Sequence, residues 1–148
     1  MSDEELIQRF ESDAIPEGSF HHADHVRLAF AYLSQHSILD ALRRFSLALK
    51  RFAAARGKTK LYNETVTCAY FFLIRERMTR FEMQLGKTPN WDEFAAQNSD
   101  LLQWKDGILG SYYREATLKS DLARTVFVLP DKCFERQTSL LEVPRYQR

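Results

Sequence analysis

The segment from Val66 to Ile74 constrains the fold more than any other, because nearly every residue in it is apolar. A helix that is apolar on all sides for two turns is usually buried among other helices. We therefore predict a long central helix that begins at Asn63 or a neighbouring residue and ends near Gly86. Its main apolar stripe is predicted to consist of Thr67, Phe71, Ile74, Met78, Phe81 and Leu85.

The segment before this helix has the clearest amphipathic pattern in the chain. Apolar residues recur at helical spacing at Ile38, Leu42, Phe45, Leu49 and Phe52. Basic residues fall mostly outside that arc, at Arg43, Arg44, Lys50 and Arg51. Gly57 is a suitable end for the helix. The pattern predicts a helix that buries one face and exposes a basic one.

Shorter helices are predicted on both sides of these two. Ser2 and Glu5 form a capping box that opens a helix from residue 3 to about residue 12. Near the other end, Asn90 opens a short helix, helical pieces continue to Tyr113, and Ser120 caps a last turn. Residues 131–148 have no clear period and are predicted to form an extended or flexible tail.

No strand-like alternation, internal repeat or low-complexity tract interrupts this pattern. We therefore predict an all-α fold in a single domain, residues 1–148. The expected architecture is a helical bundle of about five to seven helices, three of them long.

The composition indicates an ordinary soluble protein, with 45% hydrophobic residues, 28% charged residues and a net charge of +1. This charge gives the whole chain no preference for nucleic acid or membranes. Cys68 and Cys133 lie far apart in the sequence, which argues against a disulfide scaffold and a zinc knuckle. The N-terminus lacks the apolar core of a signal peptide, and no apolar run approaches the roughly 20 residues that span a bilayer. We expect a cytoplasmic protein.

Three of the four histidines lie within five positions, just before a strongly apolar segment. A helix capped by Ser19 or His22 and running to about Gln35 would carry them. His22 and His25 are three residues apart and would share one face of this helix. The apolar residues that follow on that face predict that it points inward.

Glu64 is the carboxylate best placed to join the two histidines. It opens the predicted central helix, where partial burial would raise its pKa and suit a general base. His22, His25 and Glu64 could then be catalytic residues, or a two-histidine, one-carboxylate site for a divalent metal. The alternatives are a metal-free ligand site and ordinary helix-end residues bonded to backbone or water.

Five further residues are candidate ligand contacts, because they lie beside Glu64 or in a late polar group: Asn63, Thr67, Tyr113, Ser120 and Arg124. Ser120 and Arg124 are four residues apart and would share a helical face. The arginine could clamp a carboxylate ligand, pair with Glu64 or hold the tail. Cys68 is predicted to be a packing residue, since no nucleophile motif surrounds it.

Three features stand out together: an F-x-H-x-x-H pattern beginning at Phe20, the run Tyr62-Asn63-Glu64-Thr65, and residues 112–131. In these features the chain resembles a family of small uncharacterised bacterial helical proteins. The resemblance covers most of the chain from residue 20 to residue 131, and it implies a helical fold but no reaction. In that family a histidine stands at the position of Asn63. Asparagine is a poor ligand for soft divalent metals, so this departure weakens the metal hypothesis.

Two functions stay open. The first is a small-molecule-binding helical protein, either a simple binder or an enzyme that uses acid–base or metal-assisted chemistry. It requires His22, His25 and Glu64 to converge on one cavity. The second is a non-catalytic interaction module that uses the basic helix 40–56 as an exposed patch. Nucleic acid is a disfavoured partner, because the aromatic residues of that helix lie on its opposite face. The oligomeric state is not predicted.

Overall fold

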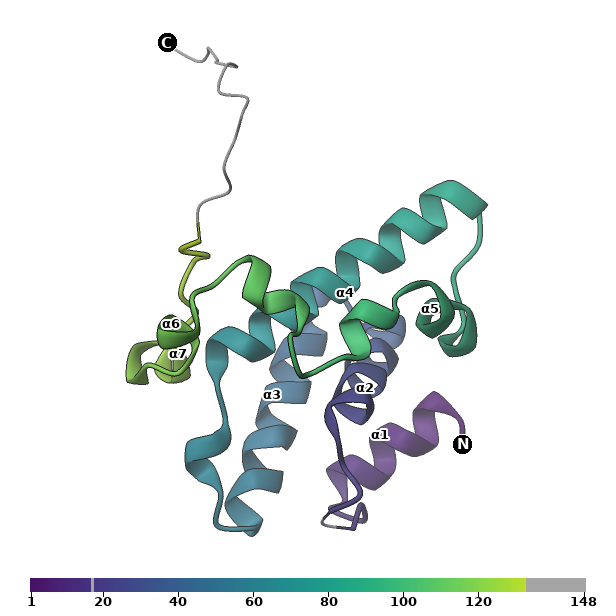
Figure 1. Ribbon diagram of the computed structural model, residues 1–148. Coiled ribbons are helices and arrows are strands. Elements are labelled where there is room, and N and C mark those ends of the chain that lie inside the picture. The colour runs from purple at the N-terminus through teal and green to yellow at the C-terminus, as the bar shows by residue number, and fades with distance from the viewer. Residues whose placement is uncertain (17, 133–148) are drawn as a thin grey trace, which may run out of the picture.

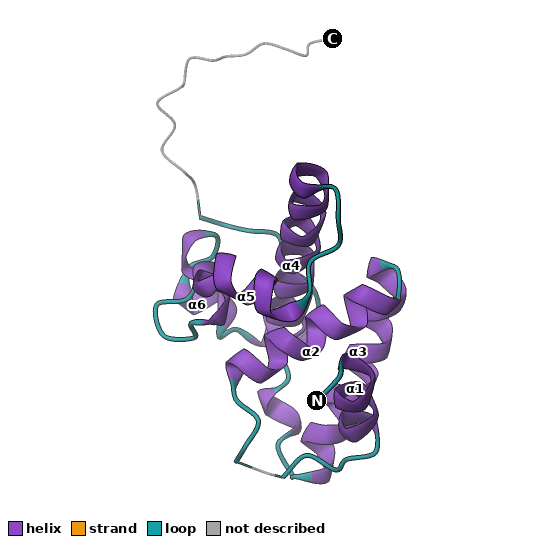
Figure 2. Cartoon of the chain, turned by 90° about the vertical axis from the view of Figure 1, so that its right-hand side faces the viewer, coloured by secondary structure: helices purple, strands orange, loops and turns teal. Residues whose placement is uncertain are grey.

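The computed structural model describes residues 1–16 and 18–132, and in that part of the chain it is all-α, with no strand (Figures 1 and 2). In chain order the elements are α1 (Asp3–Glu11), α2 (His22–Gln35), α3 (Ile38–Ala55), η1 (Thr59–Leu61), α4 (Glu64–Leu85), α5 (Trp91–Gln97), η2 (Ser99–Leu102), η3 (Ile108–Ser111), α6 (Glu115–Leu118) and α7 (Asp121–Thr125). Three helices, α2, α3 and α4, are long. The all-α prediction is confirmed.

The central helix is α4. Asn63 caps it, because its side-chain oxygen accepts a hydrogen bond from the Val66 N–H at 3.0 Å. Gly86 ends it with a φ of 70°, a left-handed conformation that glycine adopts without strain. The predicted stripe is buried as far as Phe81, whereas Leu85, at the projecting end of α4, is 56% exposed (Figure 2).

Helices α1, α2 and α3 pack against one another below α4 (Figure 1). Phe10 of α1 stacks on Phe45 of α3, with ring centroids 5.8 Å apart. Phe45 in turn contacts Phe71 of α4 at 5.0 Å. The predicted capping box of α1 is present, with Ser2 and Glu5 each accepting a hydrogen bond from the other's backbone N–H. The three phenylalanine rings connect α1, α3 and α4, and buried residues of α2 belong to the same hydrophobic core.

The N-cap of α2 is His21, so the predicted caps Ser19 and His22 are wrong. Asp24 takes the third position of the helix, and its carboxylate accepts a hydrogen bond from the His21 N–H at 2.9 Å. A carboxylate in a first turn also interacts favourably with the helix dipole. The bond from Asp24 therefore fixes where the histidine helix begins.

The chain after α7 returns to η3 and α6. Asp131 accepts hydrogen bonds from the Arg114 N–H and the Thr117 hydroxyl. The ammonium group of Lys132 donates to the Gly110 carbonyl at 2.7 Å. These two residues are thus held in place without regular secondary structure, and residues 133–148 of the predicted tail lie outside the described residues. No helix of the described residues combines the length and the apolar character needed to cross a membrane.

Candidate functional site

His22 is half-buried and connects α2 to η2 through a hydrogen bond, a connection that we call the α2 joint. Its Nε2 atom lies 2.9 Å from the Leu101 carbonyl oxygen, which can only accept, so Nε2 is assigned the proton. The imidazole ring also contacts Tyr70 at 4.9 Å and Trp104 at 5.2 Å between centroids. Burial lowers the pKa of His22, and the bond to Leu101 opposes this shift. The imidazole ring thus connects the two elements, and its burial disfavours the charged form.

His25 belongs to a different environment. Its ring stacks on Phe20, with centroids 4.1 Å apart and planes inclined by 24°. Phe20 also contacts Phe10 and Phe52, so His25 borders the aromatic core. Burial lowers the pKa of His25 to about 4, His22 adds to the shift, and Asp24 opposes it. A histidine that is neutral throughout the physiological range packs as an aromatic ring and is a poor proton carrier.

Glu64 contacts neither histidine through its hydrogen bonds. Its Oε1 atom accepts from the Tyr62 hydroxyl at 2.7 Å, and its Oε2 atom lies 4.0 Å from the sulfur of Cys68. The ammonium group of Lys50 lies 5.0 Å above the Tyr62 ring. Burial raises the pKa of the Cys68 thiol to about 11, Glu64 adds to this, and Lys50 opposes it. The thiol is therefore protonated near neutral pH, as expected for a packing residue.

The predicted metal set is not formed. Among the described residues, no three side chains of His, Cys, Asp or Glu are grouped closely enough to hold a metal ion. His22 contacts η2, His25 contacts Phe20, and Glu64 contacts Tyr62. A shared first-turn position therefore does not group these three residues as metal ligands.

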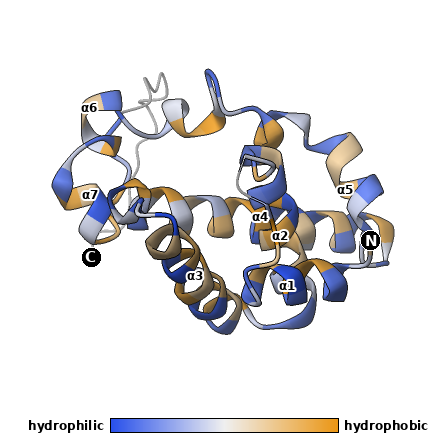
Figure 3. Cartoon of the chain, turned by 90° about the horizontal axis from the view of Figure 1, so that it is seen from below, coloured by the Kyte–Doolittle hydropathy of each residue, from blue (hydrophilic) through white to orange (hydrophobic). Residues whose placement is uncertain are grey.

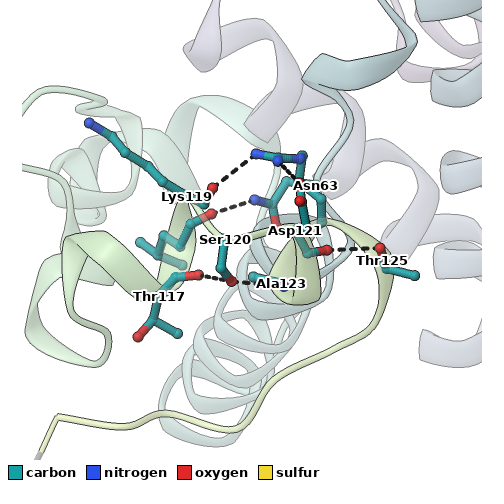
Figure 4. Close-up of polar contacts among 9 residues, drawn as sticks. Asn63, Thr117, Lys119, Ser120, Asp121, Ala123 and Thr125 are labelled. Atoms are coloured by element: carbon teal, nitrogen blue, oxygen red, sulfur yellow. Dashed lines mark hydrogen bonds and ion pairs between the residues drawn. The ribbon is translucent and has the colours of Figure 1, made fainter.

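Asn63 connects α4 to α6, whereas Ser120 and Arg124 bond only within α7 and the residues just before it (Figure 4). The Asn63 side-chain amide donates to the Leu118 carbonyl at 2.7 Å. Ser120 accepts from the Ala123 N–H at 3.1 Å and so caps α7, as predicted. Arg124 pairs with Asp121 and donates to the Lys119 carbonyl. The arginine is thus engaged within its own helix and the turn before it, not with Glu64.

Thr65 is a buried polar residue that sequence reasoning missed. Its hydroxyl donates to the Val126 carbonyl at 2.8 Å and accepts from the Val128 N–H at 3.0 Å. Tyr113 acts nearby, donating to the Val128 carbonyl at 2.6 Å. The sequence did contain a signal for this residue, because Thr65 lies next to the apolar run. A hydroxyl buried there requires a hydrogen-bond partner. Thr67, a predicted ligand contact, is buried on the same helix.

The outward side of α3 differs from all these joints, because its charged side chains lie in solvent. We define the α3 outer face by the exposed residues Leu39, Arg43, Arg44, Leu47, Lys50, Arg51, Ala54 and Ala55. At about 100° per residue they occupy one continuous arc, with the buried residues of α3 opposite. Leu39 is 71% and Leu47 46% exposed. Seen from below, α3 carries hydrophilic and hydrophobic residues in turn along the edge of the molecule (Figure 3).

Asp40 lies within this arc and partly neutralises it. Its carboxylate accepts from Arg43 at 3.1 Å and from Arg44 at 3.0 Å, and the Nδ1 atom of His36 lies 3.4 Å away. These arginines lower the pKa of Asp40, with the bond from Arg44 as the largest cause. Within residues 1–16 and 18–132, Lys50 and Arg51 form no ion pair. The C-terminal half of the α3 outer face is therefore its more positive half.

A surface hollow of about 400 Å³ lies on α1, lined by Met1, Glu5, Gln8 and Arg9. It includes none of the predicted site residues. Comparisons with family models, with curated proteins and with solved structures gave no match. The resemblance to a family of bacterial helical proteins therefore stays a prediction.

Proposed function

We propose that the protein is a non-catalytic interaction module that binds an acidic polypeptide segment on the α3 outer face. One observation carries this proposal: Arg43, Arg44, Lys50 and Arg51 are all exposed along one side of a helix whose other side is buried in the core. The candidate catalytic residues, in contrast, are each engaged by their own neighbours. Such a patch attracts a partner of opposite charge and speeds its association.

The residues between the charges favour a polypeptide over a nucleic acid. Leu39 and Leu47 are exposed among the basic side chains, and both aromatic residues of the helix, Phe45 and Phe52, face the core. Single-stranded nucleic acids stack their bases on aromatic side chains, which this face lacks. Exposed leucines instead contact apolar side chains of a protein partner.

The experiment uses labelled polyglutamate as the probe and fluorescence anisotropy as the measurement. We expect binding at about 50 mM salt that weakens strongly near 500 mM, because salt screens exposed charges. Lys50→Glu should weaken binding about tenfold, since it reverses a charge on the unpaired half of the face. Lys105→Glu is the matched control, with the same charge change at an exposed position outside α3.

Equal weakening by both variants would show that net charge alone attracts the probe, and the proposed site would be wrong. Single-stranded RNA and anionic vesicles are tested alongside polyglutamate. Tighter, Lys50-dependent binding to either of them would replace the polypeptide with that partner.

A small-molecule function is the second candidate, with His22, Tyr70 and Trp104 in place of the predicted triad. The observation that favours it is that Trp104 is 62% exposed while its ring contacts His22. A flat aromatic ligand could stack on the outer side of the indole. In a Trp91→Phe background, saturable quenching of Trp104 emission by a panel of heteroaromatic compounds, lost in His22→Ala, would support this function. If none of the compounds quenches Trp104 emission, this second function loses its support.

A further inference from the structure

The spacing of side chains on the α3 outer face identifies the shape of its partner. We infer that the acidic segment is an amphipathic helix that lies along α3 and presents acidic and apolar side chains in alternation, an inference that rests on the proposed function. Its carboxylates would pair with the basic residues of α3, and its apolar side chains would cover Leu39 and Leu47.

The first support is a ridge that alternates in chemistry. Residues four apart form the ridges that pack into the grooves of a neighbouring helix. On α3 one such ridge reads Leu39, Arg43, Leu47, Arg51, Ala55, all of them exposed. Successive members lie about 6 Å apart along the helix axis. A partner helix whose side chains also repeat every four residues can match this alternation over several turns.

The second support is the backbone of α3, whose N–H and C=O groups are already hydrogen-bonded within the helix. An extended peptide gains affinity mainly by hydrogen bonding to an exposed sheet edge. The described part of the chain contains no strand, so it offers no such edge. A helical partner satisfies its own backbone hydrogen bonds and needs only side-chain contacts. The face therefore suits a helix better than an extended segment.

The third support is an asymmetry of charge and side-chain size along the α3 outer face. At the N-terminal half, Arg43 and Arg44 share the single carboxylate of Asp40, so only one of their two positive charges is left unbalanced. At the C-terminal half, Lys50 and Arg51 form no ion pair among the described residues. Ala54 and Ala55 follow, and their small side chains permit close approach of a second helix. The acid-rich end of the partner should therefore face Lys50 and Arg51.

The test compares three labelled acidic peptides of about 18 residues, a length of roughly 27 Å when helical. The first alternates Leu and Glu at four-residue spacing on one helical face. The second has the same composition in an order that destroys this face, and the third is polyglutamate. Binding to the full chain is measured by anisotropy, and peptide helicity by circular dichroism.

We expect the first peptide to bind about tenfold more tightly than the other two and to gain helicity when bound. Leu47→Gln should remove most of this preference. Leu122→Gln, at a leucine that is 63% exposed on α7, is the matched control and should leave it unchanged. Lys50→Glu should weaken binding more than Arg43→Glu, because Arg43 is already paired with Asp40.

Each other outcome has a distinct meaning. Equal binding of the three peptides, with no effect of Leu47→Gln, overturns the helical partner and leaves the proposed function intact, because charge alone then suffices. Binding of none of the three overturns both proposals. Equal effects of Lys50→Glu and Arg43→Glu overturn the inferred orientation of the partner.

Discussion

The first turns of α2 and α4 carry the same kind of sequence signal, yet the two helices use it differently. In both, polar residues stand at the start of a core helix, and in both a side chain bonds to a backbone carbonyl that arrives later in the chain. His22 contacts the Leu101 carbonyl, and Thr65 contacts the Val126 carbonyl. The Thr65 joint of α4 is uncharged and buried, whereas the His22 joint of α2 is half-buried and contains a titratable imidazole. Polar helix starts therefore mark connections between segments as readily as they mark catalytic sites.

The largest expected loss of stability comes from the hydrophobic core that lies between the two joints. Phe71→Ala should lower the free energy of unfolding by about 3–5 kcal/mol, because it leaves a cavity beneath α4. Phe71 is 1% exposed and its ring contacts Phe45. Chemical denaturation measures the change. A loss under about 1 kcal/mol would mean that the core closes around the smaller side chain.

The α4 joint can be broken with little change of shape. Thr65→Val should cost about 1–3 kcal/mol, because it leaves the Val126 carbonyl and the Val128 N–H without their buried partner. Thr125→Val, at an exposed threonine that bonds only within α7, is the control and should cost under about 0.5 kcal/mol. Equal effects in denaturation would show that the segment 126–128 contributes no stability through Thr65.

The first turn of α2 should respond to pH through His25, and this distinguishes it from the first turn of α4. The pKa of His25 is lowered to about 4, while an unfolded histidine titrates near 6.5. Between these values the unfolded chain binds a proton that the folded chain does not, so acid favours unfolding. The contribution of His25 to stability is complete above about pH 6.5, and on the order of 3 kcal/mol is lost as the pH approaches 4.

His25→Gln should flatten this part of the stability curve, measured by denaturation at a series of pH values. Some slope will persist, because the pKa of His22 is lowered in the same direction. Thr65→Val should shift the curve downwards without changing its slope. An unchanged slope in His25→Gln would contradict the burial of a neutral His25 ring.

The smallest expected effect comes from outside both joints. Lys50→Ala, on the α3 outer face, should change the free energy of unfolding by no more than about 0.5–1 kcal/mol, because the side chain is exposed and loses only its contact with the Tyr62 ring. The same denaturation assay measures it. A loss comparable to that of Phe71→Ala would show that α3 contributes more to the fold through this side than its exposure indicates.

Periodicity predicted the long helices well, because burial on one face imposes a pattern that is local in sequence. The caps of α4, Asn63 and Gly86, were recognisable from residue type alone. The cap of α2 was not, since His21 is an unusual N-cap and Asp24 identifies the helix start only through its bond to His21.

The candidate site was predicted less well, for a physical reason. The partners of His22, Asn63 and Thr65 are mostly backbone carbonyls, which every residue carries and no side-chain pattern distinguishes. Whether two helix starts face each other depends on how the helices cross, and residue spacing within one helix does not determine that angle. The exposed basic side of α3, in contrast, follows from one helix alone and was predicted.

The bond between Thr65 and the chain near Val128 also bears on the order of events during synthesis. Its two ends are 63 residues apart in sequence, so ribosomal translation separates them in time. Helices α1, α2 and α3 can meet through local contacts while the later helices are still being made. The Thr65 hydroxyl, in the first turn of α4, has no Val128 partner until residue 128 has left the ribosome. A nascent chain halted before that residue could form most of its hydrophobic core but would lack the hydrogen bond between Thr65 and Val128.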